Sequence, residues 1–279
     1  MIKTLRKTLL MTFIVIIGIS TLMACSKKDK ALYDSTITVE QPSITAEETM
    51  DKFMEIRKTG DMNELYKLMW PKYVEIEDTS KYQYIIAMTD YDALNSIKII
   101  DYKIDPITDY DENIKKTKVT VKYTDSSKAE KSEEANYALI KENDIWKVSP
   151  DGAIDAIDYN SEYKISDEKK LFIYVTKDLK YIDRSILKFK VVNNSGSDFS
   201  LGGTYGYKTI VDTDKGQYIA ESKTPLNLIK GLNDILTITV PNVSGTIKQI
   251  TITSVTELGQ DGLPIQSNPQ GSEIVIIPQ

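Results

Sequence analysis

The segment 45-TAEETMDKFMEIRKTG-60 decides how the folded part of this chain begins. Thr45 followed three positions later by Glu48 is a capping-box pattern, which marks the start of a helix. Apolar residues then recur at helical spacing, and Gly60 is well placed to end the helix. The apolar residues are Ala46, Met50, Phe53 and Met54. The sequence therefore predicts an amphipathic helix over residues 45–60.

Two further helices are expected after this one. Asp61 with Glu64 repeats the capping pattern, and Pro71 is expected to stop the second helix. Its apolar face would be formed by Leu65, Leu68 and Met69. The third helix is expected from Lys81 to Leu94. Its inward face would be formed by Tyr84, Ile85 and Met88.

The hydrophobic period then changes from helical to alternating. Val119, Val121 and Tyr123 alternate with polar residues, as in a half-buried strand. Further strands are expected at residues 97–104, 135–140 and 145–148, with Asn143-Asp144 as the turn before the last. Helices followed by an antiparallel meander predict an α+β domain over residues 44–150.

The rest of the chain lacks convincing helical periodicity. Seven short strand-like runs are separated by turn residues, which predicts an all-β sandwich over residues 169–279. The runs are 171–175, 186–192, 205–211, 217–220, 236–240, 247–255 and 273–277. The acidic, polar segment 151–168 is expected to be a linker between the two domains.

Short motifs connect both domains to known families. The joint Lys58-Thr59-Gly60-Asp61 between helices and the terminal strand Ile145-Trp146-Lys147-Val148 resemble the nuclear-transport-factor-like cone. In that fold, helices close over a curved sheet. The phrases Phe189–Asn194, Asp212–Tyr218 and Ile229–Gly231 resemble an immunoglobulin-like domain common in exported Gram-positive lipoproteins. The second resemblance implies fold and location, because that family has no assigned chemistry.

The N-terminus has the order of an export signal, with Lys3, Arg6 and Lys7 before an apolar run. The run ends in Leu22-Met23-Ala24-Cys25, which resembles the lipobox of bacterial lipoproteins. That resemblance implies cleavage between Ala24 and Cys25 and a diacylglycerol on the Cys25 sulfur. Residues 1–24 would be the signal peptide and residues 25–43 a polar, acylated tether on the outer face of the cytoplasmic membrane. The alternative is an uncleaved transmembrane anchor over residues 8–24.

Composition excludes several classes of site. The chain has no histidine and one cysteine, so Ser-His-Asp catalysis, histidine-bearing zinc sites, disulfides and iron–sulfur clusters are all excluded. Without residues 1–24, the 32 remaining basic residues against 41 acidic ones leave a net charge near −9, which argues against nucleic acid as a partner. We therefore expect no cofactor, no metal and no catalytic residue, although chemistry by carboxylates alone stays open.

Four aromatic residues are candidates for an apolar ligand pocket inside the cone. They are Trp70, Tyr84, Tyr137 and Trp146. The alternative is that they fill the space between helices and sheet, as aromatic residues often do. The acids Asp212 and Asp214 before Gly216 invite a calcium interpretation, but a closing Glu is missing, so a hairpin turn is expected. The cluster Asp109–Asn113 is expected to be a solvated loop rather than a cation site.

These observations predict a lipid-anchored protein of the cell envelope that binds a small ligand or an envelope protein and is not an enzyme. One alternative is a hydrolase or isomerase with two carboxylates flanking a cavity in the cone. Another is a structural or assembly spacer, which would show an exposed apolar patch or sheet edge instead of a pocket.

Overall fold

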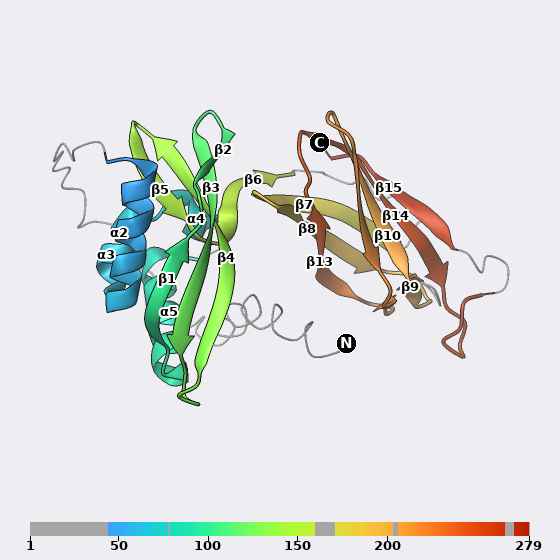
Figure 1. Ribbon diagram of the computed structural model, residues 1–279. Coiled ribbons are helices and arrows are strands. Elements are labelled where there is room, and N and C mark those ends of the chain that lie inside the picture. Colours follow the sequence, from blue (N-terminus) through green and yellow to red (C-terminus); the bar gives the residue numbers. More distant parts are fainter. Residues whose placement is uncertain (1–43, 78, 160–170, 203–205, 266–270, 279) are drawn as a thin grey trace, which may run out of the picture. The chain divides into compact units, whose positions relative to one another are not determined.

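The computed structural model describes residues 44–77, 79–159, 171–202, 206–265 and 271–278. It is an α+β structure in which N-terminal helices are followed by three antiparallel sheets (Figure 1). The predicted signal peptide and tether, with Ala24 and Cys25, lie outside the described residues. Within the described ranges, every helix is too short or too polar to cross a membrane.

The first helix is the one that the capping box predicts. Helix α2 spans Ala46–Thr59; the Thr45 hydroxyl accepts from the Glu48 N–H at 3.1 Å and the Glu48 carboxylate accepts from the Thr45 N–H at 2.8 Å. Gly60 ends the helix in the left-handed region, with a φ of 81° that favours glycine. Helix α3 spans Met62–Leu68, and Asp61 caps it through the Glu64 N–H. Both predictions are confirmed.

Pro71 does more than stop α3. It occupies the first turn of a short helix, α4, which spans Pro71–Ile76 and buries Tyr73, Val74 and Ile76. Proline suits this place, because the first N–H groups of a helix have no partner within the helix. The prediction treated Pro71 as an end signal and missed the helix that it begins.

Helix α5 spans Lys81–Asn95, as predicted, and begins with a capping box of Ser80 and Gln83. The expected inward face is only half-buried, and α5 has no fully buried side chain. On its other side Tyr82 and Leu94 are 73% and 83% exposed. Of the four described helices, α5 is therefore the least covered.

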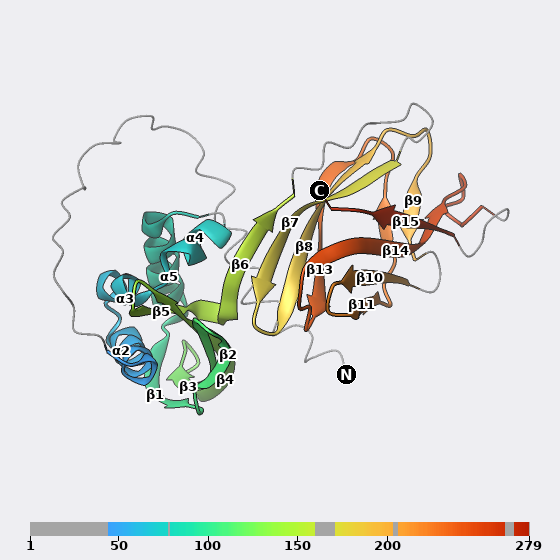
Figure 2. The same ribbon diagram turned by 90° about the horizontal axis from the view of Figure 1, so that it is seen from above.

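The first sheet is five-stranded and curls into a half-barrel (Figure 2). Its strand order is β1-β3-β4-β5, and β2 pairs with β3. Strand β3 is long enough for β1 to pair with residues 119–124 and β2 with residues 114–116. The strands are β1 Lys98–Ile104, β2 Thr108–Asp111, β3 Ile114–Thr124, β4 Glu130–Glu142 and β5 Ile145–Ser149. The turn at Asn143-Asp144 is confirmed, with both φ angles positive at 50° and 63°.

Part of the expected linker is a strand. Strand β6, Ala153–Asp158, pairs with β7 in the second sheet, so the linker prediction is wrong for these residues. Its buried or half-buried residues are small or spaced between acids, which conceals the apolar alternation. A 3-10 turn, Pro150–Gly152, leads into it. The remaining residues of the expected linker, 160–168, lie outside the described ranges.

Two further antiparallel sheets follow. One has the order β13-β8-β7-β6; the other has the order β11-β10-β14-β9-β12, with β15 paired to β14. Apolar side chains from both sheets form a single buried cluster around Phe189, Val211 and Ile250. The strands are β7 Leu171–Tyr181, β8 Arg184–Asn193, β9 Phe199–Leu201, β10 Tyr207–Thr213, β11 Gln217–Ser222, β12 Leu226–Leu228, β13 Asn233–Pro241, β14 Ile247–Glu257 and β15 Ser272–Ile276. All seven predicted runs correspond to strands, whereas the three-residue strands β9 and β12 were too short to predict.

Contacts divide the chain into two compact units. Among the described residues, the half-barrel unit comprises 44–107, 118–135 and 141–148. The paired-sheet unit comprises the described residues of 108–117, 136–140 and 149–278. The contact boundary therefore assigns β2 and parts of β3 and β4 to the second unit.

Candidate functional site

The four aromatic residues singled out from the sequence have different surroundings. Trp70 is 3% exposed, and its indole N–H donates to the Glu142 carboxylate at 2.9 Å. Tyr84 is half-buried on α5, with its ring edge-on to Tyr73 at 5.8 Å between centroids. Tyr137 on β4 and Trp146 on β5 are half-buried. Trp70 therefore has the surroundings of a core residue, while a role of the other three in a pocket stays a prediction.

The two acidic segments are hairpins. Strands β10 and β11 pair across the turn at residues 213–216, and the Thr213 N–H donates to the Gly216 carbonyl at 2.8 Å. The expected turn is therefore present. The segment from Asp109 is not a loop: Asp109 and Asp111 belong to β2, and Glu112 and Asn113 turn the chain into β3.

A shallow cavity of about 280 Å³, open to solvent on one side, lies elsewhere in the half-barrel unit, where α2, α5 and β1 meet. It is lined by Arg57, Lys58, Thr59, Gly60, Met62, Thr89, Asp92, Ile97, Lys98 and Ile99. Most of these residues lie at the ends of elements. Gly60 ends α2, Asp92 is in the last turn of α5, and Ile97 and Lys98 lead into β1.

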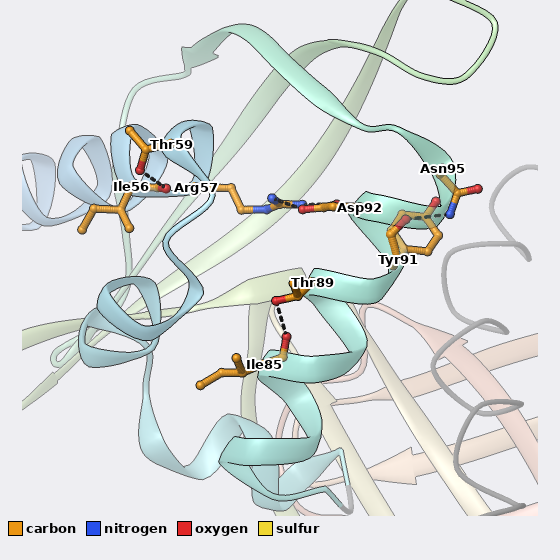
Figure 3. A network of polar contacts seen from close by, with 8 residues as sticks. All are labelled: Ile56, Arg57, Thr59, Ile85, Thr89, Tyr91, Asp92 and Asn95. Carbon is orange, nitrogen blue, oxygen red and sulfur yellow. Dashed lines mark hydrogen bonds and ion pairs between the residues drawn. The ribbon is translucent and has the colours of Figure 1, made fainter.

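An arginine and a carboxylate join α2 and α5 at this cavity (Figure 3). The Arg57 guanidinium donates to Asp92 Oδ2 at 2.5 Å and, through its other terminal nitrogen, to Asp92 Oδ1 at 2.9 Å. The side chains are 16% and 17% exposed. Such a bidentate pair fixes the plane of the guanidinium as well as its position.

The pair leaves hydrogen-bonding capacity on the arginine. A guanidinium has five N–H donors, and Asp92 takes up one on each of two nitrogens. Arg57 can therefore stay bound to Asp92 and still donate to a molecule in the cavity. An arginine held in this way loses less side-chain entropy when it binds a ligand.

Two hydroxyl groups add acceptors to the lining. Thr59 donates its proton to the Ile56 carbonyl at 2.8 Å, and Thr89 donates to the Ile85 carbonyl at 2.8 Å (Figure 3). Since each proton is engaged, the lone pairs of the two oxygens remain as acceptors. The lining therefore offers charged donors and neutral acceptors together.

The charge of the lining is opposite in sign to that of the chain. The lining contains three basic residues, Arg57, Lys58 and Lys98, and a single acid, Asp92, whereas the whole chain has a net charge of −6. Arg57 and Lys58 also lie in the last turn of α2, where basic side chains are stabilised by the helix dipole. The cavity is thus a locally positive site on an acidic protein.

Sequence reasoning missed this site. Arg57 and Asp92 are 35 positions apart, and nothing in either helix identifies the other as its partner. The available signal was that Arg57 falls on the half-buried side of a helix otherwise lined by methionine and phenylalanine. A half-buried arginine at such a position is expected to pair with an acid, but the sequence does not show which acid that is.

No known family model and no curated protein matches this chain. Within the described ranges, no three acidic side chains are grouped in a way that could hold a metal ion. The cavity is therefore interpreted from its own residues.

Proposed function

We propose that this protein is a lipid-anchored binding protein of the cell envelope, and that its half-barrel unit holds a small organic anion without catalysing a reaction. The observation that carries the proposal is the Arg57 guanidinium, fixed by Asp92 at the wall of a cavity that also contains Lys58 and Lys98. The cavity contains three cationic side chains and one carboxylate.

The donors and acceptors of the lining define the class of ligand. A carboxylate or phosphate group would accept from Arg57 and the two lysines, and charge-assisted hydrogen bonds of this kind contribute about 1.5–3 kcal/mol each. A hydroxyl or ammonium group on the same molecule would donate to Thr59 or Thr89. At about 280 Å³ the cavity is at the small end of ligand sites, which typically measure about 300–1,000 Å³. The ligand is thus a hydroxylated or amino-bearing acid of metabolite size.

The single acid of the cavity lining favours binding without catalysis. A glycosidase-type mechanism needs two carboxyl groups on opposite sides of the substrate. The described lining has one acid, Asp92, and both of its oxygens accept from Arg57. This arrangement favours holding an anion over transferring a proton.

The proposed function includes a fold family for each unit and an anchor in the membrane. We assign the half-barrel unit to the nuclear-transport-factor-like cones and the paired-sheet unit to the immunoglobulin-like sandwiches. Helices preceding a curled sheet support the first assignment, and two sheets with one common core support the second. The anchor would be a diacylglycerol on Cys25 after cleavage behind Ala24, supported by the order of charged, apolar and small residues in the leader.

Extraction of the full-length protein from membranes tests the ligand. Native mass spectrometry of the detergent-solubilised protein should show an additional mass of metabolite size, and negative-ion analysis of the released molecule should show an acid. Arg57→Gln should lose that mass, whereas Arg184→Gln, on β8, should retain it. An unliganded wild-type protein that also fails to bind added acids of this size would contradict the proposal.

The anchor is tested separately. The Cys25-containing N-terminal peptide should carry the mass of a diacylglycerol, and Cys25→Ala should release the protein from membranes into the medium or leave it uncleaved. A wild-type protein with an intact residue 1–24 segment and an unmodified thiol would contradict the proposed processing.

A further inference from the structure

A buried carboxylate in the paired-sheet unit has no part in the proposed function. Asp178 lies on β7 and is 0% exposed. It pairs across the sheet with Leu187 of β8 and with Ile157 of β6. Directly opposed residues of antiparallel strands point to the same side, and Leu187 belongs to the core that the two sheets share. The Asp178 side chain therefore points into that core.

A β-bulge gives Asp178 this orientation. Val175 pairs with Phe189 and faces the core, and the register then shifts so that Lys177 pairs with Lys188. With strict alternation from Val175, residue 178 would point away from the core. The extra residue of the bulge reverses the side, as bulges often do where a side chain has to be redirected.

Neither oxygen of the carboxylate makes a hydrogen bond of good geometry with a described residue, although the Ser185 hydroxyl is close enough to lower the carboxyl pKa. Buried polar groups are rarely left in this way, and an ionised carboxylate without a partner is among the most costly groups to bury. Burial raises the pKa of the Asp178 carboxyl to about 6; the nearby Ser185 hydroxyl and the Lys180 charge act against this shift, and the Asp155 charge adds to it. Burial raises the pKa of Tyr159, which follows β6, and the Asp178 charge adds to this rise.

Lys177 is next to Asp178 in sequence but points to the other side of β7, so Lys180 is the nearest cation of this strand on the same side as Asp178. It is two residues away on β7 and thus on the same side, since the register has no shift between them. Its ammonium group donates instead to the Gly245 carbonyl at 3.2 Å. Gly245 lies in the loop between β13 and β14, with a φ of 83°, and a Cβ there would collide with the Asp214 carboxylate.

The same loop is bonded to the β10–β11 hairpin. The Thr246 N–H donates to Asp214 Oδ1 at 2.7 Å, and the hydroxyl oxygens of Ser244 and Tyr218 are 2.6 Å apart. Lys180 therefore connects the sheet that contains Asp178 to a loop that is fastened to the other sheet.

We propose that Asp178 is a proton-operated switch that controls this loop. When Asp178 is protonated, it is accommodated in the core and Lys180 holds the Gly245 carbonyl. When Asp178 is ionised, it attracts the Lys180 ammonium group, and the loop at residues 242–246 loses its bond to β7. The switch responds to the pH at the outer surface of the membrane, where the leader is expected to place the protein.

The test is an NMR titration of the full chain in detergent micelles, with carboxyl-¹³C aspartate and ¹⁵N labels. The Asp178 carboxyl should titrate near pH 6 rather than near 4, and the amide signals of Gly245 and Thr246 should shift with the same midpoint. In Asp178→Asn the loop signals should lose this midpoint. In Lys180→Met, Asp178 should still titrate, at a higher pH, while the loop no longer responds.

Lys188→Met, on β8, is the matched control and should leave the loop response in place. A carboxyl that titrates near pH 4, or a loop that does not respond in the wild-type protein, would overturn the proposal. The fold of each variant can be checked at pH 5, where a neutral Asp178 favours folding of the wild type and of the two lysine variants. The outcome is independent of ligand binding at Arg57, since the two proposals concern different units.

Discussion

Asp92 and Asp178 show how differently the two units treat a carboxylate with little exposure. In the half-barrel unit Asp92 is 17% exposed and bound by both of its oxygens to Arg57 at the wall of a cavity. In the paired-sheet unit Asp178 is fully covered, and neither of its oxygens makes a hydrogen bond of good geometry. A paired carboxylate near solvent can orient an arginine for a ligand, whereas an unpaired one in a closed core can respond only to protons.

The largest effect should come from the closed core. Phe189 is 0% exposed within the cluster common to the two sheets, and Phe189→Ala should cost about 3–5 kcal/mol of unfolding free energy. Met88→Ala, on the half-buried face of α5, should cost about 1 kcal/mol, because little apolar area is lost there. Urea-induced unfolding of the full chain, followed by circular dichroism, measures both. Equal losses of unfolding free energy in the two variants would contradict the contrast between a closed core in the paired-sheet unit and a more open half-barrel unit.

Asp178→Asn should stabilise the protein at neutral pH. The folded-state pKa of about 6 is above the unfolded value of 3.8, so the folded form holds the proton more tightly and stability falls as pH rises through this window. The ionised carboxylate therefore costs about 3 kcal/mol above pH 6, which asparagine would remove. At pH 3.5 the Asp178 side chain is neutral, so the wild type and Asp178→Asn should have nearly the same free energy of unfolding. Unfolding midpoints measured at pH 3.5 and 7.5 decide this; a gain that does not depend on pH would contradict the assigned titration.

Asp92→Asn should weaken the junction between α2 and α5. It replaces a carboxylate that accepts through two oxygens with a neutral group that has one acceptor oxygen, at a cost of about 1–3 kcal/mol, so the arginine is oriented less firmly. Anion binding should weaken even though one negative charge has been removed from the cavity. Glu221→Gln, at an exposed pair with Lys208, should change neither stability nor binding. Tighter binding by Asp92→Asn would show that Asp92 repels the ligand instead of orienting Arg57.

The smallest effect concerns the start of the half-barrel unit. Thr45→Ala removes the cap of α2 and should cost about 1 kcal/mol, and Thr45→Ser should restore most of it. Thermal unfolding of the two variants provides the comparison. A loss of several kcal/mol would mean that this cap supports more than one helix end.

The sequence predicted those parts of the fold that local chemistry controls. The capping box at Thr45, the turn at Asn143-Asp144 and the alternation through Val119 each determine their own element within a few residues. Strand β6 and the helix at Pro71 were missed because each is only six residues long, too short to show a clear hydrophobic period. The core position of Asp178 depends on a one-residue bulge, and the pairing of Arg57 with Asp92 depends on how two helices meet. Neither has a local pattern from which it could have been read.

The cavity at Arg57 is proposed to hold an organic anion. Glycerate and glycerol are of similar size and both carry hydroxyl groups, but only glycerate has a carboxylate. Titrating each into the ¹⁵N-labelled full chain in detergent should shift the amide signals of Gly60, Ile97 and Lys98 with glycerate alone. Lys58→Gln should weaken this binding several-fold, and Lys52→Gln, exposed on the same helix, should not. Equal shifts with glycerol would contradict the choice of an anion, and a cavity whose signals respond to neither compound would contradict the claim itself.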